Sequence, residues 1–167
     1  MTATIIIDVQ NDFVSGVLGT PEARAMVPRL VQKLQNTSND LIFTQDTHDA
    51  TKYPKTAEGR LVPPHCFKNS NGWQIVSSLK PFVSRGKIVE KQTYGTTQLP
   101  ALVKNYATIE ICGLCTDICV VANAIILRTF YPETKIVIDA NCCAGTTTDA
   151  HNAALAVMKS CGCYIEY

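Results

Sequence analysis

The residues of this chain that are best suited to chemistry stand at the ends of short apolar runs, far apart in the sequence. Asp8 ends the first run, Asp46 and His48 follow the second, and Lys91 follows the third. The fourth run leads into a turn that carries Cys119. A carboxylate, an ammonium group and a thiol in one place can move a proton and create a nucleophile, which is the chemistry of covalent hydrolysis. Each residue alone has an ordinary structural explanation, so this chemistry requires a fold that brings them together.

Cys119 is the strongest candidate for the nucleophile. A Thr-Asp pair just before it is placed to cap a helix, which would put Cys119 in the first turn. There the free backbone N–H groups and the helix dipole favour a thiolate. Asp8 could take the thiol proton and return it to a leaving amine, with Lys91 as a fixed positive charge between them. Spacing alone does not exclude Cys115 as the nucleophile.

The elements that must position these residues alternate between strand and helix. Short apolar runs rich in β-branched residues predict six strands, at residues 4–7, 40–44, 87–90, 107–112, 135–138 and 163–167. Amphipathic segments between them predict helices at residues 23–34, 116–130 and 150–157, with weaker ones at 73–79 and 98–104. Pro28 should kink or restart the first of these helices.

This alternation predicts an α/β protein, a three-layer α/β/α sandwich around a mostly parallel six-stranded sheet. The carboxyl ends of parallel strands share one edge of the sheet, and open sheets of this kind bind ligands there. We therefore expect Asp8, Lys91, Cys119 and the Asp46/His48 pair to converge at that edge.

Composition and charge exclude several classes of protein. The 167 residues, of which 46% are apolar and 17% charged, suit a single domain over residues 1–167. Fifteen Lys and Arg against 14 Asp and Glu leave a net charge of +1 without a basic block, which argues against nucleic-acid or anionic-membrane binding. No apolar run reaches the roughly 18 residues of a membrane span, and no basic stretch precedes the first run, so a cytosolic location is expected.

Cysteine is unusually frequent, with eight residues in the chain. A disulfide framework is a poor expectation for a cytosolic protein, because thiols are kept reduced there. A four-cysteine zinc site is also disfavoured, because Cys112 and Cys163 belong to predicted strands rather than short turns. Most of these cysteines are expected to be small buried hydrophobic residues.

The stretch 46–72 breaks the alternation and holds two of the three histidines and three prolines. Loops this long in compact domains are usually functional. Asp46 and His48 form an Asp-x-His pair at a strand end, where alternate side chains point the same way. His65 returns after two prolines. Asp, His and His with an open position fit a site for one divalent metal ion, zinc first.

Three segments at the strand ends make the chain similar to a known family. Residues 8–13 read DVQNDF, residues 91–94 read KQTY and residues 113–120 read GLCTDICV. Together and in this order they resemble the isochorismatase-like cysteine hydrolases, the nicotinamidases and pyrazinamidases in particular, over nearly the whole chain.

The resemblance implies a Rossmann-like fold and a catalytic triad of Asp8, Lys91 and Cys119. It selects Cys119 over Cys115 as the nucleophile. It also implies a cis peptide bond between Leu114 and Cys115, and an oxyanion hole made by the backbone N–H groups of Cys115 and Cys119.

The implied activity is hydrolysis of a small carboxamide, nicotinamide first, to the acid and ammonia through a cysteine thioester. Phe13 and Tyr94 would contact the substrate ring. The implied cofactor is one divalent ion, zinc or else manganese or iron. Some relatives add a glutamate seven residues before the last histidine, so the implied ligands are Asp46, His48, Glu58 and His65. Relatives usually form homo-oligomers, and the same is expected here.

Some features leave the substrate open. Val62 stands where nicotinamidases often have an aromatic residue, and the chain is compact for the family. Family members that cleave the vinyl ether of isochorismate lack the nucleophilic cysteine, which argues against that activity. Hydrolysis of carbamoyl or ureido groups is a further alternative, mildly disfavoured by the metal ligands. A non-enzymatic redox or binding protein that uses its many thiols is the alternative from another class.

Overall fold

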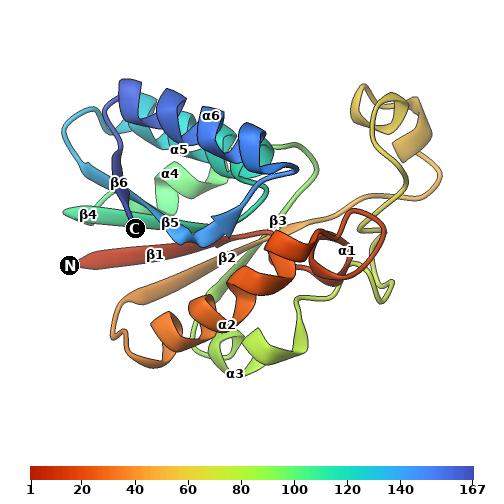
Figure 1. Ribbon diagram of the computed structural model, residues 1–167, viewed down its shortest axis with the longest axis horizontal. Coiled ribbons are helices and arrows are strands. Elements are labelled where there is room, and N and C mark those ends of the chain that lie inside the picture. Colours follow the sequence, from red (N-terminus) through yellow and green to blue (C-terminus); the bar gives the residue numbers. More distant parts are fainter.

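The six predicted strands form one sheet in which every neighbouring pair is parallel (Figure 1). In the computed structural model, which describes residues 1–167, they are β1 (Thr2–Ile7), β2 (Asp40–Asp46), β3 (Lys87–Lys91), β4 (Thr108–Leu114), β5 (Lys135–Ala144) and β6 (Tyr164–Glu166). Their spatial order is β3-β2-β1-β4-β5-β6. The order reverses between β1 and β4, and ligands bind outside such a switch point in open α/β sheets.

Helices cover both faces of the sheet and complete the predicted three-layer sandwich (Figure 1). One face carries α2 (Pro21–Gln35) and α3 (Lys80–Val83), with the short α1 (Asn11–Val14) at the carboxyl edge. The other face carries α4 (Gln98–Val103), α5 (Val121–Phe130) and α6 (Thr148–Ser160). Single turns of tighter or wider helix complete the fold, at η1 (Tyr53–Lys55), η2 (Glu58–Arg60), η3 (Ser77–Leu79) and η4 (Thr116–Val120).

The core lies on both sides of the central strands. Ile5, Ile6 and Ile7 in β1 are all fully buried, although neighbouring side chains on a strand point to opposite faces. A strand covered on both faces needs this continuous apolar run. The same burial makes the polar residue that follows, Asp8, unusual.

Two predicted helices differ in detail. Helix α2 runs through Pro28 without a restart, because Pro28 and Arg24 both face solvent, where water can satisfy the carbonyl that proline leaves free. Residues 73–79 form only the turn η3, because the chain there pairs with the segment after β1 through the Gln10–Ile75 bridge.

No helix combines the length and apolar character that a membrane crossing needs.

Candidate active site

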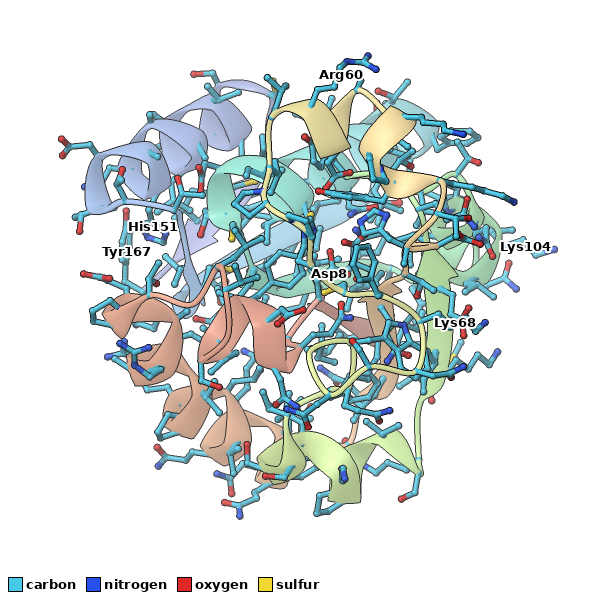
Figure 2. All side chains as sticks on the ribbon, turned by 90° about the vertical axis from the view of Figure 1, so that its right-hand side faces the viewer. Asp8, Arg60, Lys68, Lys104, His151 and Tyr167 are labelled. Atoms are coloured by element: carbon cyan, nitrogen blue, oxygen red, sulfur yellow. The ribbon has the colours of Figure 1, made fainter.

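The three residues of the predicted triad meet at the carboxyl edge of the sheet, the face seen in Figure 2, where Asp8 lies near the centre. Asp8 follows β1, Lys91 ends β3, and Cys119 lies in η4 after β4. The Lys91 Nζ atom lies 2.7 Å from Asp8 Oδ2 and 3.6 Å from Cys119 Sγ. All three residues are at most 4% exposed. The fold therefore assembles a carboxylate, a cation and a thiol away from bulk water.

Asp8 is held in an uncommon backbone conformation. Its φ angle is +48°, a left-handed value that Asp adopts more readily than most residues. Thr44 on β2 accepts the backbone N–H of Asp8 through Oγ1 at 3.1 Å and donates its hydroxyl to Asp8 Oδ1 at 2.6 Å. This clamp fixes one carboxylate oxygen and turns the other toward Lys91. Strained residues of this kind concentrate at functional sites.

Burial sets the ionisation of the triad. Burial raises the pKa of Asp8 above its usual range, although the adjacent Lys91 opposes the shift. Burial by itself would lower the pKa of Lys91, but Asp8, Cys119 and Asp46 raise it well above its usual value, so Lys91 stays charged. Burial also raises the pKa of the Cys119 thiol, again opposed by Lys91. A carboxyl group with a raised pKa is suited to pass a proton in both directions.

The turn that carries Cys119 differs from the predicted capped helix. The Leu114–Cys115 peptide bond is cis, as the resemblance implies. The backbone N–H groups of Ile118 and Val120 then donate to the Cys115 carbonyl, both at 3.1 Å, which makes η4 a π-helical turn without a side-chain cap. The helix start that the sequence predicts to favour a thiolate is therefore replaced by a π-helical turn, and burial raises the pKa of the Cys119 thiol.

Asp117 has another role than the expected cap. Its carboxylate accepts the backbone N–H of Thr146 at 2.8 Å and the Thr146 hydroxyl at 2.6 Å.

Gly113, just before the turn, has a φ of +120°, and a Cβ there would lie 2.1 Å from the Ile7 carbonyl oxygen. Glycine is therefore required where the end of β4 approaches β1.

A mostly apolar cavity of about 260 Å³ reaches Cys119, the predicted nucleophile of the triad. Phe13, Tyr94, Cys115 and Cys119 line it, the residues for which the family resemblance implies substrate contact or an oxyanion hole. The sequence did not indicate several of its other wall residues, namely Leu18, Thr20, Leu61, Ile118 and Thr146. Thr146 follows the end of β5, so the rule that sites form at strand ends could have found it. The others come from loops and from η4, where no periodic pattern marks them.

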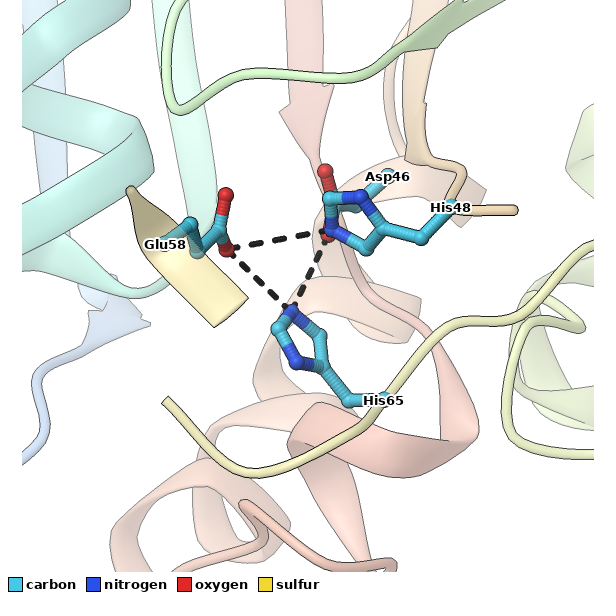
Figure 3. A group of neighbouring side chains, drawn as sticks. All are labelled: Asp46, His48, Glu58 and His65. Atoms are coloured by element: carbon cyan, nitrogen blue, oxygen red, sulfur yellow. Dashed lines mark ion pairs between the residues drawn. The ribbon is translucent and has the colours of Figure 1, made fainter. Parts of the chain in front are cut away.

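The predicted metal ligands also come together, beside the same cavity (Figure 3). Asp46 ends β2 and His48 follows it, whereas Glu58, in η2, and His65 belong to the long connection between β2 and β3. The four ligand atoms all lie within 4.8 Å of one another. Glu58 Oε1 lies 3.4 Å from His65 Nε2, and Asp46 Oδ2 lies 3.2 Å from the same atom.

The chemistry of this cluster fits a divalent cation. Asp46 Oδ2 and His48 Nε2 are buried 2.8 Å apart, but neither atom makes a well-oriented hydrogen bond. His65 Nδ1 lies 2.8 Å from the Pro63 carbonyl oxygen, which can only accept, so a neutral His65 ring would carry its proton on Nδ1 and present the Nε2 lone pair to a cation. Two imidazoles and two carboxylates are the donors that zinc and similar ions take in proteins.

Asp46 connects the two clusters. Its Oδ1 atom lies 3.1 Å from Lys91 Nζ, while its Oδ2 atom faces His48 and His65. Burial would raise the pKa of Asp46, but the two histidines and Lys91 outweigh it and hold the pKa below its usual range. The carboxylate is therefore ionised and touches both the triad and the ligand group.

The remaining cysteines do not form a second reactive set. All eight are free, and seven of them are buried. Burial raises the pKa of Cys115 and of Cys142 to about 12. Thiol exchange needs accessible thiolates, so this pattern does not favour a thiol-based redox or binding protein. It confirms that most of these cysteines serve as small core residues.

Comparisons with known proteins agree with this geometry. The structure is similar to that of the nicotinamidase/pyrazinamidase PncA from Bacillus subtilis, with a TM-score of 0.82, 29% identity and 99% of each chain covered. It is also similar to the pyrazinamidase of Pyrococcus horikoshii in complex with zinc, with a TM-score of 0.84, 25% identity, and 99% of this chain and 98% of that chain covered. In sequence, it is 24% identical to a nicotinamidase of Saccharomyces cerevisiae over 83% of this chain and 87% of that protein.

The family assignment covers almost every residue described above. The isochorismatase domain family matches residues 2–166, which contain all three triad residues and all four members of the ligand group. The chain belongs to the isochorismatase family.

Proposed function

We propose that this protein is a cysteine amidohydrolase that cleaves a small heteroaromatic carboxamide, nicotinamide first, to the acid and ammonia. One observation carries the proposal: a buried lysine lies between a carboxylate at 2.7 Å and a thiol at 3.6 Å, and this thiol lines a largely apolar cavity. The sequence and structural similarity to nicotinamidases and pyrazinamidases supports the same reaction.

Asp8 moves the proton in each step. It takes the proton of the Cys119 thiol as the sulfur attacks the amide carbon, and then gives that proton to the departing ammonia. A thioester remains on Cys119. Asp8 next removes a proton from water, the hydroxide attacks the thioester, and the acid and the free thiol are released. Lys91 stays charged throughout and offsets the negative charge on Asp8 and on the sulfur.

The amide oxygen becomes negatively charged during both attacks. The backbone N–H groups of Cys115 and Cys119 form the oxyanion hole in this proposal, because both residues line the cavity beside the nucleophile. Removing one such donor typically costs about 10²–10³ in rate. Phe13 and Tyr94 supply apolar surface for the ring, and Val62 in place of an aromatic residue leaves that wall less bulky.

Asp46, His48, Glu58 and His65 would hold one divalent ion, zinc first. When bound, the ion would supply a Lewis-acid contact for a ring nitrogen of the substrate and so orient the amide. It is not needed to create the nucleophile, because Cys119 supplies one.

Ammonia release from a panel of amides tests this function. We expect turnover of nicotinamide and pyrazinamide, and weaker turnover of benzamide, which matches their shape but lacks a ring nitrogen. Removing the ion with a chelator should raise KM for nicotinamide more than for benzamide, and should leave iodoacetamide alkylation of Cys119 within about twofold. Turnover of a ureido compound or of isochorismate, with no ammonia from any carboxamide, would contradict the proposal.

A further inference from the structure

Gln10 and Asp12 stand in the same segment as Asp8 but take no part in the proton transfers described above. Gln10 is completely buried, and a buried polar side chain must find hydrogen-bond partners. Both residues direct their side chains to the ligand group rather than to Cys119.

Gln10 pairs with Asp46 as a neighbouring strand would. Its Oε1 atom accepts the backbone N–H of Asp46 at 2.7 Å, and its Nε2 atom donates to the Asp46 carbonyl at 2.9 Å. The same Nε2 donates to the Trp73 carbonyl at 2.8 Å. Every strong donor and acceptor of this amide is therefore used, and both backbone groups of one ligand residue are fixed just where β2 ends.

Asp12 fixes the backbone next to His65, a second member of the ligand group. Its Oδ2 atom accepts the backbone N–H of Cys66 at 2.8 Å, directly after the ligand His65. Cys66 has a left-handed φ of +46°, so the chain turns sharply at this point. A Cβ on Gly72 would lie 2.0 Å from the same carboxylate oxygen, so Asp12 occupies a closely fitted place between two parts of the loop.

We propose that Gln10 and Asp12 are positioning residues for the metal centre. Through them, the segment 8–12 fixes the position of the ligand group relative to Asp8, the proton carrier. Gln10 fixes the backbone of Asp46, Asp12 fixes the backbone beside His65, and Asp8 lies two residues before Gln10. The inference rests on the metal centre proposed above. Partners of this kind typically contribute about 10- to 100-fold to metal affinity.

Zinc retention against a chelator series tests this role on the zinc-loaded protein. In Gln10→Glu, a carboxylate would face the Asp46 and Trp73 carbonyls, which need a donor. In Asp12→Ala the acceptor for Cys66 N–H is lost. We expect both variants to release zinc at about 10- to 100-fold lower free chelator than the unchanged chain. Asp12→Asn keeps an acceptor oxygen and should recover most of the loss.

Asn11→Ala is the matched control. The Asn11 side chain donates to the Asn71 carbonyl at 2.8 Å, so it also ties this segment to the loop, but it touches no residue next to a ligand. It should retain zinc within about twofold of the unchanged chain. Cobalt-substituted protein gives a second readout, since displaced ligands change the visible absorption band while Cys119 alkylation stays constant.

Each other outcome overturns the inference. Zinc held as tightly by Gln10→Glu and Asp12→Ala as by the unchanged chain would show that neither residue positions the ligands. Equal loss in Asn11→Ala, or loss of the far-ultraviolet circular dichroism of the zinc-loaded variants, would show a general structural role instead. An unchanged chain that binds no zinc would overturn the metal centre and this inference together, whereas ammonia release would still test the hydrolase.

Discussion

Two lysines in this protein each bridge two carboxylates, but at different places on the sheet. Lys91 lies at the carboxyl edge, 2.7 Å from Asp8 and 3.1 Å from Asp46. Lys33 projects from α2 over the middle of the sheet, 2.5 Å from Glu110 and 2.7 Å from Asp139. The charge pattern and the distances are closely similar.

The surroundings separate the two clusters. The Lys91 side chain is 1% exposed and lies beside the Cys119 thiol, which lines the apolar cavity. The Lys33 side chain is 22% exposed and lines a polar surface depression together with Asp139 and the Cys142 thiol. The Asp8 side chain is completely buried and burial raises its pKa, whereas the Glu110 side chain is 14% exposed. A lysine between carboxylates with a thiol nearby is thus a catalytic arrangement only where burial and an apolar substrate cavity accompany it.

The largest expected effect comes from removing the nucleophile of the Lys91 cluster. Cys119→Ala should lower the turnover of nicotinamide by at least about 10⁴-fold, because the covalent route is lost. Cys115→Ala should keep substantial activity, because it removes a side chain while leaving the backbone N–H in place. Steady-state ammonia release measures both, and the opposite ranking would make Cys115 the nucleophile.

The carboxylates of the two clusters can be compared by isosteric changes. Asp8→Asn should lower kcat/KM by about 10²–10⁴-fold, since an amide cannot carry the proton in any step. Glu110→Gln, the matched change beside Lys33, should leave kcat/KM within about twofold. A loss below tenfold in Asp8→Asn would rule out Asp8 as the general base.

Lys91→Met should lower activity at neutral pH by about 10- to 1000-fold. Lys91 lowers the pKa values of Asp8 and Cys119 against the effect of burial, so its loss raises both. An opposite charge at this distance typically shifts a pKa by about 1–3 units. The pH profiles of kcat/KM and of Cys119 alkylation should therefore both move to higher pH. Profiles that stay in place while the rate falls would show that Lys91 does not set these ionisations.

Lys33→Met should have the smallest effect on catalysis, within about twofold, while lowering the free energy of unfolding by about 1–3 kcal/mol. The pKa of Lys33 is raised because Asp139 and Glu110 outweigh the effect of its partial burial. A raised pKa keeps Lys33 protonated in the folded state up to alkaline pH. Its contribution should therefore be full below the unfolded pKa of about 10.4 and be lost only as pH rises above that value. Urea unfolding at pH 6 and pH 9 should give the same difference between variant and unchanged chain, and a difference that shrinks by pH 9 would contradict this assignment.

The sequence by itself determined six strands in a mostly parallel sheet and the set of residues at their carboxyl ends. It could do so because continuous apolar runs mark buried parallel strands, and parallel strands bring their ends to one edge. Asp8, Lys91 and Cys119, 111 residues apart from first to last, were placed together on this ground. Asp46 and His48 were paired by the period of two along a strand. The family resemblance then added Glu58, which no local pattern marks.

The tertiary structure alone decided the ionisation of the thiol and the supports of the ligand group. Local helix geometry favours a thiolate at Cys119, whereas burial by residues from other elements raises the pKa of this thiol and Lys91 opposes that shift. Gln10 and Asp12 show no periodicity that predicts their partners, because Asp46 and Cys66 lie 36 and 54 residues away along the chain. Burial and long-range hydrogen bonds depend on how separate segments meet, and a pattern within one segment does not carry that information.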